Sequence, residues 1–470
     1  MANLKNFESY ANEIIEKFQI PGVSIGIDKY AQPFYYQGFG YRNKEEKLAV
    51  TPDTVFGIAS VTKSFTCVGI MQLQEAGKLS VHDKVIKYLP EFKTPDAEKT
   101  AQITIHHFMT NSSGLPPLPS LVYANKRSFD QDPSTKDYPG LDVAESEQGP
   151  IDTHEELMEF IAGLDFDLLG PPGIHFSYSN DAFSLLGAII ERVSGQKYEE
   201  YIKEHILIPA GMHHSTFDLS DLAEYDNITM SYAKKEEDGK TVVYQAPVWW
   251  DAPAMRAAGY LKSTVHDMLR YTEIYRKKGI VHGTRILSEE SVKAMTYPYI
   301  ETEPGSYYGY GLTVTPDFFG YKLIEHGGNL KAIASLMSII PDLGITGMIL
   351  TNLAAVPAGP LLRAALHDTI GQEIGASHMT FQKREITEEE IKRLVGTYMS
   401  NEGAKITIGL DEGDITFFSQ GEYHPIKCIG ENLFDVNVKD QQEIVRFIEN
   451  ANGEVDRIAY HYRQFPKIKE

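Results

Sequence analysis

The chain has 470 residues, enough for two or three domains and at least one large core. Its 65 acidic residues exceed its 44 basic residues, and the resulting net charge of −21 argues against nucleic acid or an anionic membrane as a partner. The most apolar stretch, residues 333–350, is interrupted by Pro341, Asp342 and Gly344, so we expect no membrane span.

The N-terminus does not resemble a signal peptide, because residues 1–18 contain three glutamates and no apolar centre. We therefore expect a cytoplasmic protein, although a chain trimmed of its export signal would look the same. The two cysteines, Cys67 and Cys428, give neither a disulfide framework nor metal-ligand spacing.

Hydrophobic spacing predicts an amphipathic helix over residues 4–18 and two strands over 22–28 and 33–41. A helix is expected to begin at or just before Ser60 and to close at Gly77. Shorter or later helices are expected at four places: residues 103–115, 153–164, 181–194 and 263–278.

Two long segments lack such spacing. Residues 116–150 are rich in Pro, Asp, Ser and Gly, and we interpret them as a rim over an active site. Residues 215–262 are expected to be loop-rich and include Trp249 and Trp250, which either line a substrate groove or pack under the rim.

Four strands and a helix follow, over residues 310–314, 321–325, 334–340, 347–351 and 359–370. Strands at both ends of this region, with helices between them, predict an α+β domain whose sheet is assembled from both ends of the sequence. After residue 376, six short alternating runs lie between turns such as Asn452-Gly453 and the 411–414 segment. They predict a separate antiparallel barrel or half-barrel.

The first candidate motif is Ser60-Val61-Thr62-Lys63. On a helix, positions i and i+3 share one face, so the Ser60 hydroxyl and the Lys63 amine would meet in one pocket. A serine needs a neighbour to accept its proton, and burial lowers the pKa of a lysine toward the range where it can do so. The alternative is a serine N-cap followed by an exposed lysine.

The second motif is Tyr178-Ser179-Asn180, on a tight connection before a helix. A phenol between a lysine and a serine can act as general base and acid, provided that positive neighbours lower its pKa. An asparagine two residues later could bridge the lysine to a substrate amide. The alternative is Asn180 as the N-cap of the next helix, with Tyr178 packed beneath it.

The third motif is His326-Gly327-Gly328-Asn329, at the end of a predicted strand. Glycines in a strand let another backbone approach, as a substrate lying along the strand edge would require. The N–H that follows them could pair with the Ser60 N–H as an oxyanion hole. The alternative is a β-turn with a surface histidine.

The order of the three motifs resembles the serine β-lactamase and penicillin-binding-protein superfamily, in particular its class C-like branch of D,D-carboxypeptidases, D-aminopeptidases, esterases and class C β-lactamases. Four further stretches resemble that branch: residues 108–115, 187–195, 257–264 and 308–311. The resemblance implies a β-lactamase/transpeptidase-like domain over residues 1–376, with a helical subdomain at roughly 64–260. Residues 377–470 are similar to the lipocalin-like barrels appended to some bacterial and archaeal peptidases of this group.

By this resemblance, Ser60 is the acylated nucleophile, Lys63 its proton-handling partner and Tyr178 the base that later protonates the leaving group. Asn180 orients the lysine and the substrate amide. His326 occupies the place of the lysine in the Lys-Thr-Gly motif of β-lactamases. The oxyanion hole maps to the backbone N–H groups of Ser60 and Asn329, and the substrate lies along Gly327, Gly328 and Asn329.

The histidine is a departure from the β-lactamase pattern. With His326, the fixed positive charge that holds a β-lactam carboxylate is lost or becomes pH-dependent. We therefore expect a serine hydrolase acting on small peptides or amides, some with D-residues, or on small esters. The alternatives are a carboxylesterase with little peptidase activity, a slowly deacylating penicillin-binding receptor and a scaffold protein.

No cofactor or metal is expected, because the adjacent pairs His106-His107 and His213-His214 face different ways. The expected partners are a small molecule or short peptide, a covalent β-lactam adduct and further copies of the chain through the C-terminal domain. That domain could equally narrow the cleft or bind an apolar ligand. Cys67 is expected in a helix core and Arg256 in a surface ion pair rather than on a substrate carboxylate.

Overall fold

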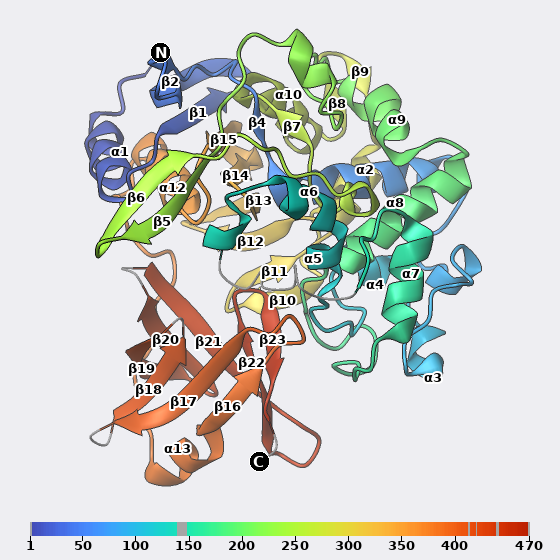
Figure 1. Ribbon diagram of the computed structural model, residues 1–470, viewed down its shortest axis with the longest axis vertical. Helices are drawn as coiled ribbons and strands as arrows, with labels where there is room; N and C mark the ends of the chain where they lie inside the picture. The colour runs from blue at the N-terminus through green and yellow to red at the C-terminus, as the bar shows by residue number, and fades with distance from the viewer. Residues whose placement is uncertain (1, 139–147, 412–413, 420, 439–440, 469–470) are drawn as a thin grey trace.

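The computed structural model describes residues 2–138, 148–411, 414–419, 421–438 and 441–468. Its largest element is a nine-stranded antiparallel sheet, in the order β10-β11-β12-β13-β14-β15-β1-β2-β3 (Figure 1). The strands span β1 (Gly22–Lys29), β2 (Gln32–Asn43), β3 (Leu48–Ala49), β10 (Ile300–Glu303), β11 (Ser306–Tyr308), β12 (Thr313–Phe318), β13 (Tyr321–Leu330), β14 (Ile333–Ile340) and β15 (Ile345–Thr351).

Strands from the two ends of the domain sequence pair with each other near the middle of the sheet. Strand β1 lies antiparallel to β15, with Val23 opposite Thr351 and Lys29 opposite Ile345. This register confirms the prediction that one sheet is assembled from both ends of the sequence. Because β1, β14 and β15 are buried in the middle of the sheet, their sequences are nearly continuous apolar runs.

Helices cover both faces of the sheet (Figure 1). On one face lie α1 (Lys5–Lys17) and α12 (Ala358–Ile370), whose apolar residues share a buried cluster with the sheet. The helix α10 (Val265–Arg276) packs on the other face, and its Val265 would clash with a Cβ at Gly26 of β1. Two further elements follow α10: the small hairpin β8 (Ile280–Val281) and β9 (Thr284–Arg285), and the helix α11 (Glu289–Met295).

The helical region between β3 and α10 surrounds the helix that follows Ser60. It contains α2 (Thr62–Glu75), α3 (Ala97–Thr100), α4 (Ile105–Met109), α5 (Ser120–Ala124), α6 (Lys126–Gln131), α7 (His154–Gly163), α8 (Asn180–Ser194) and α9 (Tyr198–Ile202). Helix α2 is buried all round, which is why its sequence has little amphipathic contrast. Two short strands, β4 (Phe56–Gly57) and β7 (Lys262–Ser263), tie the start of this region to its end.

Two segments predicted as loops contain regular structure. The rim segment includes α5 and α6, although residues 139–147 lie outside the described residues. Residues 215–262 include a hairpin, β5 (Tyr232–Glu237) and β6 (Lys240–Gln245), closed by an Asp238-Gly239 turn. The hairpin was missed because Lys234 to Thr241 is a charged surface run with no apolar alternation.

The C-terminal region forms an eight-stranded, nearly closed antiparallel barrel preceded by α13 (Glu388–Leu394) (Figure 1). Its strands are β16 (Gly396–Met399), β17 (Lys405–Asp411), β18 (Asp414–Ser419), β19 (Glu422–Gly430), β20 (Leu433–Val438), β21 (Gln441–Glu449), β22 (Val455–Tyr460) and β23 (Arg463–Pro466). A bridge between Tyr398 and Lys467 brings the first strand to the last. The barrel has its own core, in which Phe417, Phe447 and Ile458 are almost fully buried.

The barrel confirms the predicted all-β module and adds β16 and β23, which the sequence reading had missed. The predicted 411–414 turn includes residues 412–413, which lie outside the described residues. Among the described residues, no helix is long and apolar enough to cross a membrane.

Candidate active site

Ser60 lies in a short 3₁₀ turn, η1 (Ala59–Val61), that leads directly into α2. The residue before it, Ala59, has a φ of 47°, a left-handed conformation that is costly for a side chain other than glycine. Such strain is found where the surrounding structure holds a functional residue in a fixed position. The turn is anchored by the Ser335 hydroxyl, which donates to the Ile58 carbonyl at 2.9 Å.

Lys63 is completely buried, which excludes the alternative of an exposed lysine. Its Nζ lies 3.2 Å from Ser60 Oγ, 2.8 Å from Asn180 Oδ1 and 2.6 Å from the Ala258 carbonyl oxygen. Burial and the positive charge of Arg463 hold the pKa of Lys63 well below its usual value. Nζ donates to the Asn180 and Ala258 oxygens, so a neutral amine in this position would turn its lone pair toward Ser60.

Tyr178 lies over the lysine, with Lys63 Nζ 4.7 Å from the centre of its ring. Burial raises the pKa of Tyr178, while a hydrogen bond with Ser60 and the charge of Arg463 oppose the rise. The condition set for a tyrosine base, a lowered pKa, is therefore not met. Burial therefore favours the protonated phenol of Tyr178 and the neutral amine of Lys63.

Asn180 is the first residue of α8 and not its N-cap. The cap is Ser179, whose hydroxyl accepts from the Ala182 N–H at 3.1 Å. The alternative reading of Asn180 as a cap is thus wrong, and its side chain is free to accept from Lys63. The connection before α8 is held by Asn111, whose side chain and carbonyl accept from the N–H groups of Ser179 and Ser177.

His326 is buried, with 4% of its surface exposed, so it is not a surface histidine. Its Nδ1 lies 2.7 Å from the Gly327 carbonyl oxygen and therefore carries the proton, while Nε2 accepts from the Tyr308 hydroxyl at 2.9 Å. Burial, with a smaller contribution from Lys63, lowers the pKa of His326 to about 3. The imidazole is neutral at physiological pH and supplies no fixed positive charge.

Gly328 is required by the protein's own backbone. A Cβ at this position would lie 2.4 Å from the Ile58 carbonyl oxygen and 2.5 Å from Ser335 Oγ, so β13 could not approach the Ser60 turn. Strand β12 pairs with β13 only as far as Glu325. Gly327, Gly328 and Asn329 therefore have one unpaired edge facing the site, while their other edge pairs with β14.

These residues line a cavity of about 600 Å³. The structure brings Ser60, Tyr178, Asn180 and His326 to its wall together with the strand from Gly327 to Asn329, and Lys63 contacts Ser60 from beneath. Three more wall residues come from the C-terminal barrel: His461, Tyr462 and Arg463.

The barrel residues were not predicted as part of the site. They form the turn between β22 and β23 and the first residue of β23. The Tyr462 carbonyl accepts from the Tyr178 N–H at 3.0 Å, so the barrel contacts the residue beside the nucleophile. An aromatic and basic cluster, His461-Tyr462-Arg463, in a non-glycine turn was the only sequence feature that could have drawn attention to it.

The rim segment is tied to the turn after β13 by a buried ion pair between Asp132 and Lys331. Trp250 also donates to Asp132, at 2.7 Å, and packs against Phe129 of α6. Trp250 therefore packs under the rim. The turn after Asn329 is thereby fixed to the segment that covers it.

The other residues set aside from the sequence lie outside the cavity. Arg256 pairs with Glu199 and Asp251 at 2.8 and 2.6 Å. Cys67 is buried in α2, and burial raises its pKa. Within the described part of the chain, no cluster of three or more His, Cys, Asp or Glu side chains is placed to hold a metal ion.

The model of the family described as "Beta-lactamase" matches residues 7–369. The chain belongs to the β-lactamase family. It is 27% identical over 343 residues to protein flp of Staphylococcus aureus strain MW2, a match that covers 72% of this chain and 61% of that protein. It is 24% identical over 417 residues to penicillin-binding protein 4* of Bacillus subtilis strain 168, covering 85% of this chain and 84% of that one.

Among solved structures, the octameric penicillin-binding protein homologue from Pyrococcus abyssi superimposes with a TM-score of 0.70 and 29% identity. That match covers 99% of this chain and all of the archaeal one, including the barrel. The β-lactamase-like domain and the barrel therefore occur together in that homologue. With the staphylococcal relatives the match spans about 61% of their length.

Proposed function

We propose that the protein is a serine hydrolase that forms an acyl-enzyme on Ser60 and acts on small peptides, amides or esters. The observation that carries this proposal is the environment of Lys63. Its two N–H donors are taken by Asn180 and Ala258, and its lone pair is left 3.2 Å from the Ser60 hydroxyl. A neutral buried lysine in this arrangement can accept the serine proton.

In the proposed first step, Lys63 takes the proton from Ser60 as Oγ bonds to the substrate carbonyl carbon. The oxyanion receives hydrogen bonds from the N–H groups of Ser60 and Asn329. As the bond to the leaving group breaks, Tyr178 donates its proton to that group and is reprotonated from Lys63. Water then attacks the acyl-enzyme by the reverse roles and regenerates Ser60.

The neutral state of His326 makes efficient β-lactam hydrolysis the less favoured activity. A substrate carboxylate placed beside a neutral imidazole gains no charge–charge attraction. A slowly deacylating penicillin receptor remains the second candidate, since the relatives of this chain include penicillin-binding proteins. Assembly into oligomers through the barrel is proposed on the same basis, because the archaeal homologue is octameric.

The test is the intact mass of the wild type and of Ser60→Ala after mixing with a p-nitrophenyl ester and, separately, with a penicillin. We expect release of nitrophenol and a transient +acyl mass only with the wild type. Rapid ester turnover with little penicillin adduct supports the hydrolase, and a stable penicillin adduct without turnover supports the receptor. Equal behaviour of the wild type and Ser60→Ala would refute both the hydrolase and the receptor and would leave a scaffold protein as the remaining alternative.

A further inference from the structure

In the described part of the cavity wall that belongs to the β-lactamase-like domain, no arginine has both terminal nitrogens without a hydrogen bond. Among its described wall residues, His326 is neutral, with a pKa of about 3. Arg363 donates to Glu325 from Nε and Nη2, with the closest contact at 2.8 Å, so the pair of donors on that edge is already used. The pKa of Lys63, which contacts Ser60 from beneath, is lowered well below its usual value.

Arg463 of the barrel places a positively charged side chain in the wall of the Ser60 cavity. Its guanidinium carbon lies 4.9 Å from the centre of the Tyr178 ring, and the residue lines the same cavity. Stacking of a guanidinium on an aromatic face fixes its plane. The guanidinium thus lies over the ring of Tyr178, whose hydroxyl we propose protonates the leaving group.

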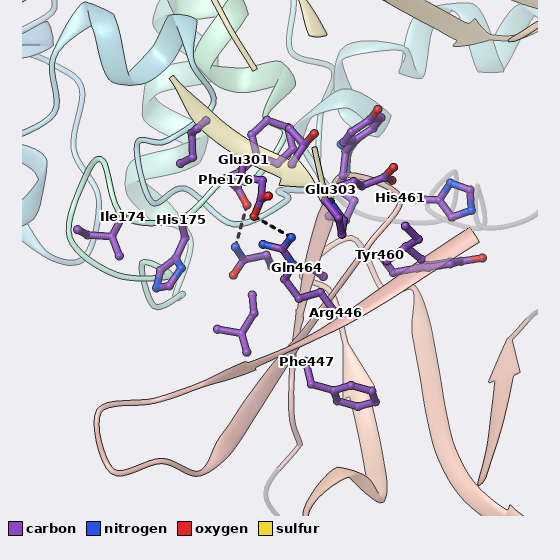
Figure 2. A pocket seen from close by; sticks show the side chains of 18 residues that line it. Ile174, His175, Phe176, Glu301, Glu303, Arg446, Phe447, Tyr460, His461 and Gln464 are labelled. Atoms are coloured by element: carbon purple, nitrogen blue, oxygen red, sulfur yellow. Dashed lines mark hydrogen bonds and ion pairs between the residues drawn. The ribbon is translucent and has the colours of Figure 1, made fainter. Parts of the chain in front are cut away.

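The barrel is held against this part of the site by contacts on both sides of Arg463. Tyr462 accepts from the Tyr178 N–H, and the Gln464 amide donates to the Phe176 carbonyl at 2.8 Å (Figure 2). Arg457 of β22 donates to the Leu169 carbonyl. These bonds run to the segment that carries Tyr178, so the position of Arg463 relative to the phenol is fixed by backbone contacts.

The turn itself is strained. His461 and Tyr462 have φ values of 47° and 62°, and two-residue hairpin turns with positive φ at both positions usually contain Asn and Gly. Bulky residues are held in this conformation only where the surrounding structure demands it. The strain therefore coincides with the one place where the barrel meets the cavity.

Arg463 also retains donors for a ligand. Its Nε pairs with Glu402 at 3.2 Å, and its side chain is 22% exposed. Within the described residues, its two terminal nitrogens make no hydrogen bond or ion pair. A planar pair of N–H donors of this kind matches a carboxylate, which it can bind through two parallel bonds.

We propose that Arg463 is a specificity-determining residue that binds a carboxylate on the leaving-group side of the substrate. The proposal rests on the proposed acyl-enzyme on Ser60. The substrate class is an acyl compound whose leaving group carries an anionic carboxylate a few bonds from the scissile bond. The positive charge that His326 does not provide thus comes from a separate domain.

The test uses two esters with the same acyl group, 3-(phenylacetoxy)benzoate and 3-(phenylacetoxy)benzamide, which differ only in the charge of the leaving group. We expect the wild type to favour the benzoate in kcat/KM. In Arg463→Gln this preference falls about 10- to 100-fold, and Arg463→Lys keeps part of it. An unchanged preference in Arg463→Gln would overturn the proposal, as would a wild type without preference.

The matched control is Arg446→Gln. Arg446 lies on the same domain and pairs with Glu301 at 2.9 Å beside a neighbouring cavity of about 380 Å³ (Figure 2). It does not line the Ser60 cavity, so the ratio of the two kcat/KM values is expected to stay at that of the wild type. A fall in the ratio equal to that of Arg463→Gln would mean that the net charge of the barrel, and not the position of Arg463, sets the preference.

Binding of the same two esters to Ser60→Ala separates this proposal from the acyl-enzyme mechanism. We expect ligand-observed NMR to give tighter binding of the benzoate by roughly tenfold, and loss of the difference when Arg463→Gln is added. If the wild type turns over neither ester but this difference is present, the proposed hydrolase fails and the carboxylate site stands. If turnover depends on Ser60 but the difference is absent, the carboxylate site fails alone.

Discussion

The β-lactamase-like domain and the C-terminal barrel both have a core of their own, but they contribute to the cavity in opposite ways. The first contributes Ser60 and Lys63, at the start of a helix buried in the fold, and the strand edge from Gly327 to Asn329. The second provides a strained surface turn and the first residue of its last strand. Under the proposed function, the reacting groups therefore lie in the interior of one domain, while substrate recognition is supplied by the exposed end of another.

The strongest test of this division is removal of the base from the interior. In Lys63→Met we expect the rate of Ser60 acylation by a neutral aryl ester to fall roughly 10²- to 10⁴-fold, because no other group in contact with Ser60 can take its proton as readily. Stopped-flow release of the leaving group measures the rate.

Lys262→Met is the matched control for Lys63→Met. Lys262 is also buried, and its Nζ donates to the Phe217 carbonyl at 2.8 Å, away from the cavity. Acylation at the wild-type rate is expected in that variant. A similar loss in both variants would mean that Lys63 acts through folding, and the assignment of chemistry to the interior would be wrong.

A second test asks whether the two cores are separate in stability. Ile458 is fully buried in the barrel core, and Ile458→Ala is expected to destabilise that domain by about 2–5 kcal/mol. Ile349→Ala does the same to the core of the large sheet. Scanning calorimetry should show each variant shifting a different transition. If both shift one common transition, the two regions unfold as one unit and the comparison fails.

A third change acts on the interior without removing a polar group. Gly328→Ala would place a Cβ 2.4 Å from the Ile58 carbonyl, so the Ser60 turn or β13 must move, at about 1–3 kcal/mol of stability. Acylation should slow as well, since the nucleophile and the oxyanion strand are displaced from one another. Urea unfolding and burst kinetics measure the two effects.

The control for Gly328→Ala is Gly163→Ala at the end of α7. A Cβ at Gly163 meets no atom within 4 Å, and alanine favours the helix. This variant is expected to be neutral or up to about 1 kcal/mol more stable. If Gly328→Ala and Gly163→Ala destabilised the protein equally, the close approach of β13 to the Ser60 turn would not explain the need for glycine at position 328.

The smallest predicted effect is that of the Arg463 charge in the barrel on the pKa of Lys63 in the β-lactamase-like domain. If neutral Lys63 is the base, as proposed, kcat/KM for a neutral ester rises as the pH increases through the pKa of Lys63. After burial, the positive charge of Arg463 is the next cause that lowers this pKa. Arg463→Gln should therefore move the acidic limb of the profile to higher pH, and Arg446→Gln should leave it in place. A limb that moves to lower pH would contradict the assignment.

Most of the fold could be predicted from the sequence, because strands buried inside the sheet are visible as apolar runs of residues. Strand β14 is buried along its whole length and mostly apolar, and its predicted bounds agree almost to the residue with the structure, as do those of α12. Strand β23 was missed because Arg463 to Pro466 is short, partly polar and ends in a proline, so no alternation is visible. The rim helices α5 and α6 were missed because helices of five and six residues are too short to show helical spacing in the sequence.

Some features of the candidate site could likewise be predicted from local spacing in the sequence, while others depend on the folded structure. Local spacing was enough to place Lys63 beside Ser60, because the helix brings the two onto one face. The protonation states could not be read from spacing, because the pKa of Tyr178 depends on how deeply the ring is buried in the finished fold. Arg463 could not be assigned at all, since its contact with Tyr178 joins residues 285 positions apart.

The turn between β22 and β23 has a consequence for how this chain can diversify. It reaches the cavity as two residues between strands that pair with each other, so their ladder is held independently of the side chains at the tip. Exchange of His461, Tyr462 and Arg463 would alter the chemical character of the cavity mouth without a change in the nucleophile or in either core. If the turn binds substrate as proposed, substrate choice can be varied by selection with only a small shift in the pH dependence of the reaction.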